Sequence, residues 1–153
     1  MGKTVGQGVV AMLVGPMGEL VVLPGLQENG HKRERVLGGG FYPVLGREFP
    51  GGAVNRGEGI IHAIRREVGE EVSGLFSSIV WENDRLRRLP GITRVEQVRD
   101  DGFMGFLVVV FALRLAESEV LRGVSELGLE LLQPGMPLRP RDAHLLKIYG
   151  AEV

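Results

Sequence analysis

Three glutamates within one short segment are the residues of this sequence best placed to do chemistry. Glu67, Glu70 and Glu71 stand at positions i, i+3 and i+4 of a stretch with helical character. In a helix this spacing puts the three carboxylates on one face, one turn apart. Like charges so close destabilise a helix by about a few tenths of a kcal/mol per pair. We therefore expect a hard divalent cation to offset the repulsion, because magnesium and calcium prefer carboxylate oxygens.

The segment from Glu58 to Val72 has the pattern of an amphipathic helix. Its apolar residues recur every three or four positions and predict a buried stripe on a face other than that of the glutamates; they are Ile61, Ile64, Val68 and Val72. Ser73-Gly74 supplies a stop, since glycine is favoured just after a helix. Such a helix can be anchored in a core while it presents its carboxylates to one point. A glutamate-rich helix face is more often plain solvated surface, however, so the three glutamates alone do not establish a metal site.

Two further charged residues complete the pattern. Arg66 follows Glu58 by eight residues, about two helical turns, so this pair can brace the helix against the preceding loop. Arg66 is adjacent to Glu67, and we expect the two side chains to face different ways. His62 has no second histidine at ligand spacing, so we expect it at the surface or satisfied by a neighbour.

Taken together, these positions resemble the Nudix box. Its pattern is glycine, five residues, glutamate, seven residues, then Arg-Glu-apolar-x-Glu-Glu-x-Gly. This sequence matches at seven positions, namely Gly52, Glu58, Arg66, Glu67, Val68, Glu70 and Glu71. Phe49-Pro50-Gly51 resembles the turn that leads into the box. The pattern departs at its last glycine, which is replaced by Ser73, with Gly74 one residue later; this residue ends the helix and is not an expected metal ligand.

The resemblance implies a fold, a cofactor and a reaction. The fold is an α/β/α sandwich with a mixed central sheet. The reaction is the attack of water on a phosphorus of a nucleoside diphosphate linked to another moiety, dependent on Mg²⁺ or Mn²⁺. The implied metal ligands are Glu67 and Glu71, then Glu70, with the backbone carbonyl near Gly52. Metal ions suit this chemistry because they neutralise phosphate charge and lower the pKa of bound water.

The implied catalytic set is Glu71, Glu67, Arg66 and Glu58, the last two as braces of the site. The general base is left open by the family, which uses either a box glutamate or an acid from a later loop. The candidates for that acid are Glu96, Asp100 and Asp101. Each of them alone is more often an ordinary surface acid.

The substrate is less sharply indicated. Glu48-Phe49-Pro50 resembles the lead-in of the ADP-ribose and sugar-nucleotide branch, and Arg33 or Arg35 would supply that branch's phosphate- or sugar-facing arginine. Pro90-Gly91 followed by Glu96 resembles a later loop of the branch. The candidate substrate residues are thus Arg33, Arg35, Glu48 and Glu96, although the charged stretch 31–35 is equally well explained as solvated loop. The alternatives are a (d)NTP pyrophosphohydrolase of the house-cleaning type and a Nudix-like binding or regulatory module without catalysis.

The elements that must hold this helix can be outlined from the periodicity. We expect a strand over Val5–Val14, its hairpin partner over Leu20–Leu23, and a loop-rich segment over 24–47. A short strand is predicted at 76–81, a mixed polar stretch at 83–99, and a strand buried on both faces at 103–115. Helices are predicted at 120–132, although Gly123 and Gly128 weaken the first, and at 141–149. Strands on both sides of a central helix indicate one mixed sheet with helices packed on it.

Composition limits the class of protein. The chain has 153 residues, 44% of them hydrophobic and 24% charged, and a net charge of −1; we expect one globular domain over 1–153. The near-neutral charge gives no overall attraction to nucleic acid or to an anionic membrane. The absence of cysteine excludes disulfides and thiolate sites and fits a cytoplasmic location. We expect a small nucleotide as the partner, with no nucleic acid and no membrane, and a homodimer, which is common in the ADP-ribose branch.

Overall fold

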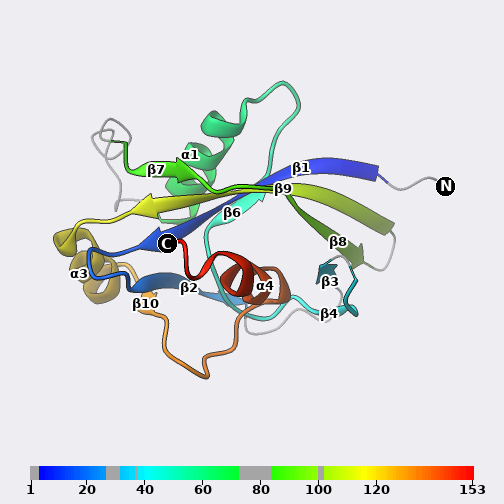
Figure 1. Ribbon diagram of the computed structural model, residues 1–153. Helices are drawn as coiled ribbons and strands as arrows, with labels where there is room; N and C mark the ends of the chain where they lie inside the picture. Colours follow the sequence, from blue (N-terminus) through cyan, green and yellow to red (C-terminus); the bar gives the residue numbers. More distant parts are fainter. Residues whose placement is uncertain (1–3, 27–31, 37, 73–83, 100–101) are drawn as a thin grey trace.

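The secondary structure is built around two long strands that lie side by side (Figure 1). The computed structural model describes residues 4–26, 32–36, 38–72, 84–99 and 102–153. The strands are β1 (Thr4–Val14), β2 (Leu20–Leu26), β3 (Arg33–Val36), β4 (Tyr42–Pro43), β5 (Gly46–Glu48), β6 (Gly51–Ala53), β7 (Leu86–Arg88), β8 (Thr93–Arg99), β9 (Gly102–Arg114) and β10 (Glu130–Leu131). The helices are α1 (Ile60–Glu71), α3 (Glu117–Glu126) and α4 (Pro140–Tyr149).

The sheet is mixed. Its main path runs β10-β2-β1-β9-β8-β3-β4, with β5 paired to β2, β6 to β1 and β7 to β9. Strands β1 and β9 are parallel from the Thr4–Met104 pair to the Val14–Arg114 pair. All other pairings between the named strands of the sheet are antiparallel. Strand β6 continues the sheet beside the middle of β1, with Gly52 opposite Val9. This pairing fixes the start of the box segment to the centre of the sheet.

Helices cover both faces of the sheet. One core joins Val9 and Val109 of the central strands to Ile64 and Val68 of α1 and to Val120 of α3. The next residues along the central strands, among them Val10 and Val110, point to the opposite face of the sheet. There they form a second core with Leu145 and Tyr149 of α4. The predicted α/β/α arrangement is therefore confirmed. So is the expectation of a strand buried on both faces, because consecutive residues of β9 enter opposite cores.

The structure corrects three of the expected segments. The stretch 24–47, expected to be loop-rich, contains the end of β2 and also β3, β4 and β5 among its described residues. The polar stretch 83–99 contains β7 and β8, and Glu96 of β8 pairs with Arg35 of β3 across the strands. The helix expected over 120–132 covers Glu117–Glu126 instead. It ends because Gly128 has a φ of +75°, which turns the chain so that Glu130 and Leu131 pair with β2. The strand expected at 76–81 lies outside the described residues.

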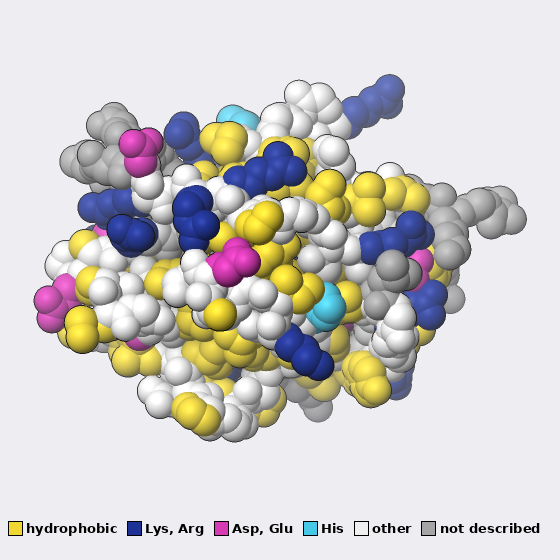
Figure 2. Space-filling view, in the orientation of Figure 1, with side chains coloured by type: hydrophobic (Ala, Val, Ile, Leu, Met, Phe, Trp, Pro, Cys, Tyr) yellow, Lys and Arg dark blue, Asp and Glu magenta, His cyan; other side chains and the backbone are white. Residues whose placement is uncertain are grey.

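The exterior has a mixed character. On the face seen in Figure 2, basic side chains are dispersed among apolar and polar ones. In the part of the chain that the structure describes, no helix has both the length and the apolar character to cross a membrane.

Candidate functional site

The predicted ion pair between Glu58 and Arg66 is present and bidentate. Arg66 Nε lies 2.8 Å from Glu58 Oε2 and Nη2 lies 2.9 Å from Oε1. Nη2 also donates to the carbonyl of Ala53 at 2.9 Å, and Glu58 accepts the backbone N–H of Asn55. The Arg66 hydrogen bonds lower the pKa of Glu58 to about 2, so the carboxylate is charged at any ordinary pH. This pair ties α1 to the end of β6, as the sequence predicted.

The expected divergence of Arg66 and Glu67 is wrong. Arg66 Nη1 donates to Glu67 Oε1 at 2.9 Å. The arginine side chain is long enough for its planar guanidinium to bond Glu58 with one edge and Glu67 with the other. His62 is at the surface and lies 2.8 Å from Glu58 through Nδ1, in agreement with its expected role.

Two of the three helix glutamates meet the backbone of β6. Glu71 Oε2 accepts the N–H of Gly51 at 2.8 Å. A Cβ atom added to Gly52 would stand 2.5 Å from Glu67 Oε1, so the carboxylate of Glu67 fills the space that only glycine leaves open. Glu70 behaves differently: its side chain is 59% exposed and its Oε1 is 3.5 Å from Arg66 Nη1. The structure thus brings Glu67 and Glu71 to Gly51-Gly52 and leaves Glu70 outside.

The environment of Glu71 holds back its ionisation. Burial is the main cause that raises its pKa to about 7, and the nearby charges of Glu48 and Glu67 add to the shift. The Gly51 N–H and the charge of Arg141 act in the opposite direction. A carboxyl group in such surroundings gains from a nearby cation, and perturbed acids of this kind are frequent at functional sites.

The oxygens at Gly51-Gly52 suit a hard divalent cation. Glu67 and Glu71 supply carboxylates, and the Gly52 carbonyl is close in sequence to both contacts. Magnesium commonly takes one or two carboxylates and completes its shell with water and substrate phosphates. Within the described residues, no three His, Cys, Asp or Glu side chains are arranged to hold an ion by themselves. The donor set therefore fits an open magnesium site better than an all-protein cage.

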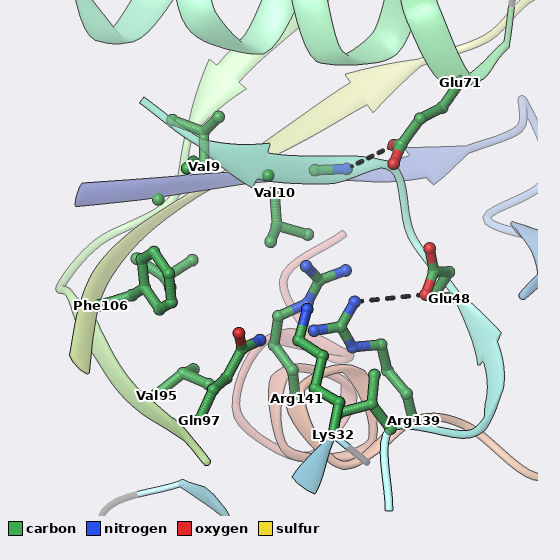
Figure 3. Close-up of a pocket in the computed structure, with 16 residues that line it drawn as sticks. Val9, Val10, Lys32, Glu48, Glu71, Val95, Gln97, Phe106, Arg139 and Arg141 are labelled. Atoms are coloured by element: carbon green, nitrogen blue, oxygen red, sulfur yellow. Dashed lines mark hydrogen bonds and ion pairs between the residues drawn. The ribbon is translucent and has the colours of Figure 1, made fainter. Parts of the chain in front are cut away.

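A cavity of about 380 Å³ opens beside this segment. Figure 3 shows α1 on one side of β6 and the cavity on the other, with Glu71 reaching to the strand. Glu48, Glu71 and the Gly51-Gly52 backbone line one side of the cavity. Lys32, Arg139 and Arg141 point into it from the other side. The cavity is thus bipolar, with carboxylates facing a cationic wall.

Arg139 is held in place by two carboxylates. Its Nη2 and Nε donate to the two oxygens of Glu34 at 2.6 and 3.0 Å, and its Nη1 lies 3.3 Å from Glu48 Oε2. Glu34 is fully buried. Burial alone would raise its pKa, but the hydrogen bonds and charges of Arg139 and Arg141 outweigh it and hold the pKa below the usual value. The charged stretch 31–35 is therefore not simply a solvated loop.

Arg141 and Asp142 hydrogen-bond to the backbone of Phe49. Asp142 Oδ2 accepts the Phe49 N–H at 3.1 Å, and Arg141 Nη2 donates to the Phe49 carbonyl at 2.8 Å. The two side chains also pair with each other, Nε to Oδ1, at 2.8 Å. Asp142 is fully buried, and burial raises its pKa despite the neighbouring arginines. Because Phe49 precedes Pro50-Gly51 directly, α4 fixes the position of the segment that meets Glu71.

The four candidate substrate residues fall into two groups. Glu48 lines the cavity. Arg35 and Glu96 form an ion pair of 2.7 Å across β3 and β8. Their neighbours Glu34 and Gln97 bond each other on the cavity side, so Arg35 and Glu96 point to the opposite face of the sheet. Arg33 shares that orientation and is exposed. Asp100 and Asp101 lie outside the described residues.

Sequence reasoning missed the cationic wall. Lys32 was expected only as part of a charged loop, and Arg139 and Arg141 had no expected role. Their one local signal is a charge-rich segment at the start of a predicted helix, Arg139-Pro140-Arg141-Asp142, in which three of the four residues are charged. Only the tertiary fold brings that run to the Gly51-Gly52 segment, some ninety residues earlier in the chain.

Comparison with known proteins bears on the fold. No protein-family model matches the sequence, and no curated protein does. Among solved structures, a mutT/nudix family protein from Listeria innocua has a TM-score of 0.60 at 16% identity, over 96% of this chain and 92% of that one. A protein from Deinococcus radiodurans has a TM-score of 0.58 at 20% identity, over 94% and 82%. The chain has the Nudix fold. At these identities the likeness is one of fold, and the roles of individual residues depend on the geometry described above.

Proposed function

We propose that this protein is a metal-dependent hydrolase of the diphosphate bond in a nucleoside diphosphate linked to another moiety. One observation carries the proposal: Glu67 and Glu71 of α1 meet the Gly51-Gly52 backbone at the edge of a cavity whose far wall is cationic. A diphosphate needs both features, a site for a divalent ion and positive charge for its remaining oxygens. The Nudix box and the fold agree with this chemistry.

In this proposal each residue of the box has a separate task. Glu67, Glu71 and the Gly52 carbonyl would hold Mg²⁺ or Mn²⁺, with Glu70 at the outer edge of the site. The ion would stabilise charge on the phosphate oxygens and supply water of lowered pKa. Arg66 and Glu58 hold α1 against β6, and the Gly51 N–H orients the carboxylate of Glu71. Positioning of this kind matters because small displacements of catalytic groups cost large factors in rate.

We further propose that the general base is a glutamate of the box. The alternative acid that the structure describes, Glu96, accepts Arg35 at 2.7 Å and lies 3.3 Å from Arg94. It points away from the cavity side of β8. A carboxylate held by two arginines on the opposite face of the sheet is poorly placed to take a proton from water at Gly51-Gly52.

For the substrate we propose ADP-ribose or a sugar nucleotide. The support is Glu48, which belongs to the Glu48-Phe49-Pro50 segment that resembles this branch. Its side chain lines the cavity next to Gly51. The other residues of that resemblance, Arg33, Arg35 and Glu96, do not line it. The (d)NTP pyrophosphohydrolase activity therefore stays the competing hypothesis among enzymes, and product analysis separates the two.

The test is a panel of substrates with full product identification. Purified protein is incubated with ADP-ribose, NDP-sugars, dinucleoside polyphosphates and (d)NTPs, each with Mg²⁺, with Mn²⁺ and with EDTA. Release of a nucleoside monophosphate and a sugar phosphate supports the proposal, whereas pyrophosphate from a (d)NTP supports the competing activity. Nucleotide binding without turnover on the whole panel identifies a binding module and overturns the proposal. Turnover that persists in EDTA overturns the role of the metal.

A further inference from the structure

We propose that Arg141 and Lys32 form a phosphate-binding subsite on the α4 side of the cavity, distinct from the carboxylates of α1. Building on the proposed function, the subsite would take a phosphate of the substrate that the metal ligands do not hold. Neither residue belongs to the box, and Arg141 comes from the C-terminal helix. The substrate would thus be recognised jointly by α1 and α4.

Arg141 has a hydrogen-bonding edge available for a ligand. Its Nε and Nη2 are bonded to Asp142 and to the Phe49 carbonyl. Nη1, which carries two of the five guanidinium N–H donors, has no partner among the described residues. Every buried side-chain nitrogen in the described part of the chain has a hydrogen-bond partner. Because Nη1 has none, it is accessible to solvent. Since Arg141 lines the cavity and is otherwise buried, Nη1 faces the open space of the cavity.

The surroundings make this guanidinium rigid before any ligand arrives. Three hydrogen bonds of 2.8 to 3.0 Å fix its plane. A donor that is already ordered loses little conformational entropy on binding, so its contacts contribute more fully to affinity. A fixed arginine fork of this kind suits the paired oxygens of a phosphate.

Lys32 adds a second positive charge to the same wall. Its side chain is partly exposed and points into the cavity beside Arg141 (Figure 3). Arg139, next to it, is engaged by Glu34 and Glu48. Arg141 is paired with Asp142 through Nε and Nη2 and directs Nη1 at the cavity, and the Lys32 side chain points into the same space. The opposite wall bears Glu48 and Glu71, which repel an anion unless a metal ion intervenes. A ligand with two linked phosphates matches both walls.

The experiment measures binding of inorganic pyrophosphate by calorimetry, first in EDTA and then with Mg²⁺. Lys32→Gln and Arg141→Lys each remove one element of the subsite, and the second keeps the charge that Asp142 requires. Lys147→Gln is the matched control, because Lys147 is exposed in the last turn of α4. We expect each of the two subsite variants to weaken metal-free binding about tenfold, the usual scale for one charge-assisted hydrogen bond. We expect the control to bind like the wild type.

Glu71→Gln separates this subsite from the metal site. It should retain metal-free binding of pyrophosphate and lose the gain in affinity that Mg²⁺ gives. Folded Lys32→Gln and Arg141→Lys proteins with wild-type affinity in EDTA would overturn the subsite, as would a wild-type protein that binds no pyrophosphate without metal. Lys32-dependent binding without turnover of any panel substrate would support the subsite and refute the proposed hydrolase. Turnover with an unchanged KM in Lys32→Gln would do the reverse.

Discussion

The guanidinium of Arg66 joins the carboxylate of Glu58 through two hydrogen bonds of 2.8 and 2.9 Å. A third N–H reaches the Ala53 carbonyl at the end of β6, and a fourth reaches Glu67. One side chain thus connects the helix, the loop before it and the strand that carries Gly52. The position of Glu67 over Gly52 depends on this connection, because Arg66 contacts both of the elements involved.

Replacing Arg66 by lysine should therefore lower turnover, because Glu67 and Glu71 are both retained but Glu67 is no longer held in its position over Gly52. Lysine keeps the charge but cannot bond Glu58, Glu67 and Ala53 at once. Loss of groups that orient metal ligands typically costs about 10–100-fold in activity or metal affinity. Steady-state kinetics and Mg²⁺ titration would measure the effect. Arg122→Lys is the control, since Arg122 forms an exposed i,i+4 pair with Glu126 on α3. Equal kinetics for the two variants would exclude a positioning role for Arg66.

Replacing Glu71 by glutamine should lower turnover by at least about a hundredfold. This is more than we expect from the loss of a group that only orients a metal ligand. The neutral side chain can still accept the Gly51 N–H, so the fold should be retained. Its lost charge should weaken Mg²⁺ binding, since the hard cation prefers carboxylate oxygen. Circular dichroism and activity are measured together. Glu126→Gln, an exposed change on α3, serves as the control. A folded Glu71→Gln protein with wild-type turnover would remove Glu71 from the site.

The sequence was informative where function depends on local spacing. The spacing of Glu58, Arg66, Glu67 and Glu71 predicted the brace and put the two helix glutamates on one face. The contact with Gly52 was implied by the resemblance to the Nudix box. The central strands were equally readable, since β1 and β9 are long apolar runs. Glu70 is the exception within the helix: it shares the predicted face, but its contact with Arg66 directs it away from Gly52.

The cavity could not be predicted in the same way. Its cationic wall combines Lys32, which precedes β3, with Arg139 and Arg141 at the start of α4, far beyond the box in sequence. The two segments are joined by the pair of Glu34 and Arg139. Short charged strands such as Arg33–Val36 lack the apolar alternation that marks a strand. A buried glutamate between two arginines, as in Arg33-Glu34-Arg35, also looks like a solvated charge run until its partner is known. The information that was missing is tertiary pairing, which no local pattern contains.

The hydrogen bonds from α4 to the Phe49 backbone predict that replacing Asp142 strongly lowers the stability of the fold. Asp142→Asn conserves the shape but leaves the buried charge of Arg141 without its partner. Breaking a buried ion pair on one side costs about 3–5 kcal/mol, and we expect a loss in that range from urea unfolding at pH 7. Asp84→Asn, at an exposed turn, is the control. A loss below about 1 kcal/mol, the range of exposed pairs, would show that the pair contributes little.

The lowered pKa of Glu34 leads to a prediction of how the free energy of unfolding changes in acid. Its pKa in the folded protein lies below the value of 4.5 that applies to an unperturbed glutamate. The folded state therefore binds fewer protons than the unfolded state in this window, and the stabilisation by Arg139 and Arg141 is fully present above pH 4.5. It is lost as the pH falls from 4.5 through the folded pKa. Buried Asp142 acts in the opposite sense, because its pKa is raised and protonation relieves the cost of its burial.

The contribution of Glu34 can be isolated with Glu34→Gln. At pH 7 the variant should be less stable than the wild type by about 3 kcal/mol, since Arg139 and the backbone N–H of Arg141 lose a charged acceptor. The difference should shrink as the pH is lowered below 4.5, because the wild-type glutamate then becomes neutral as well. Asp142 shares Arg139 and Arg141 with Glu34, so the comparison is repeated between Asp142→Asn and the Glu34→Gln/Asp142→Asn double variant, in which Asp142 does not titrate. Urea unfolding at pH 7, 5, 4 and 3 measures the difference. A difference that stays constant down to pH 3 would mean that Glu34 remains charged throughout this range or that its ionisation does not stabilise the fold.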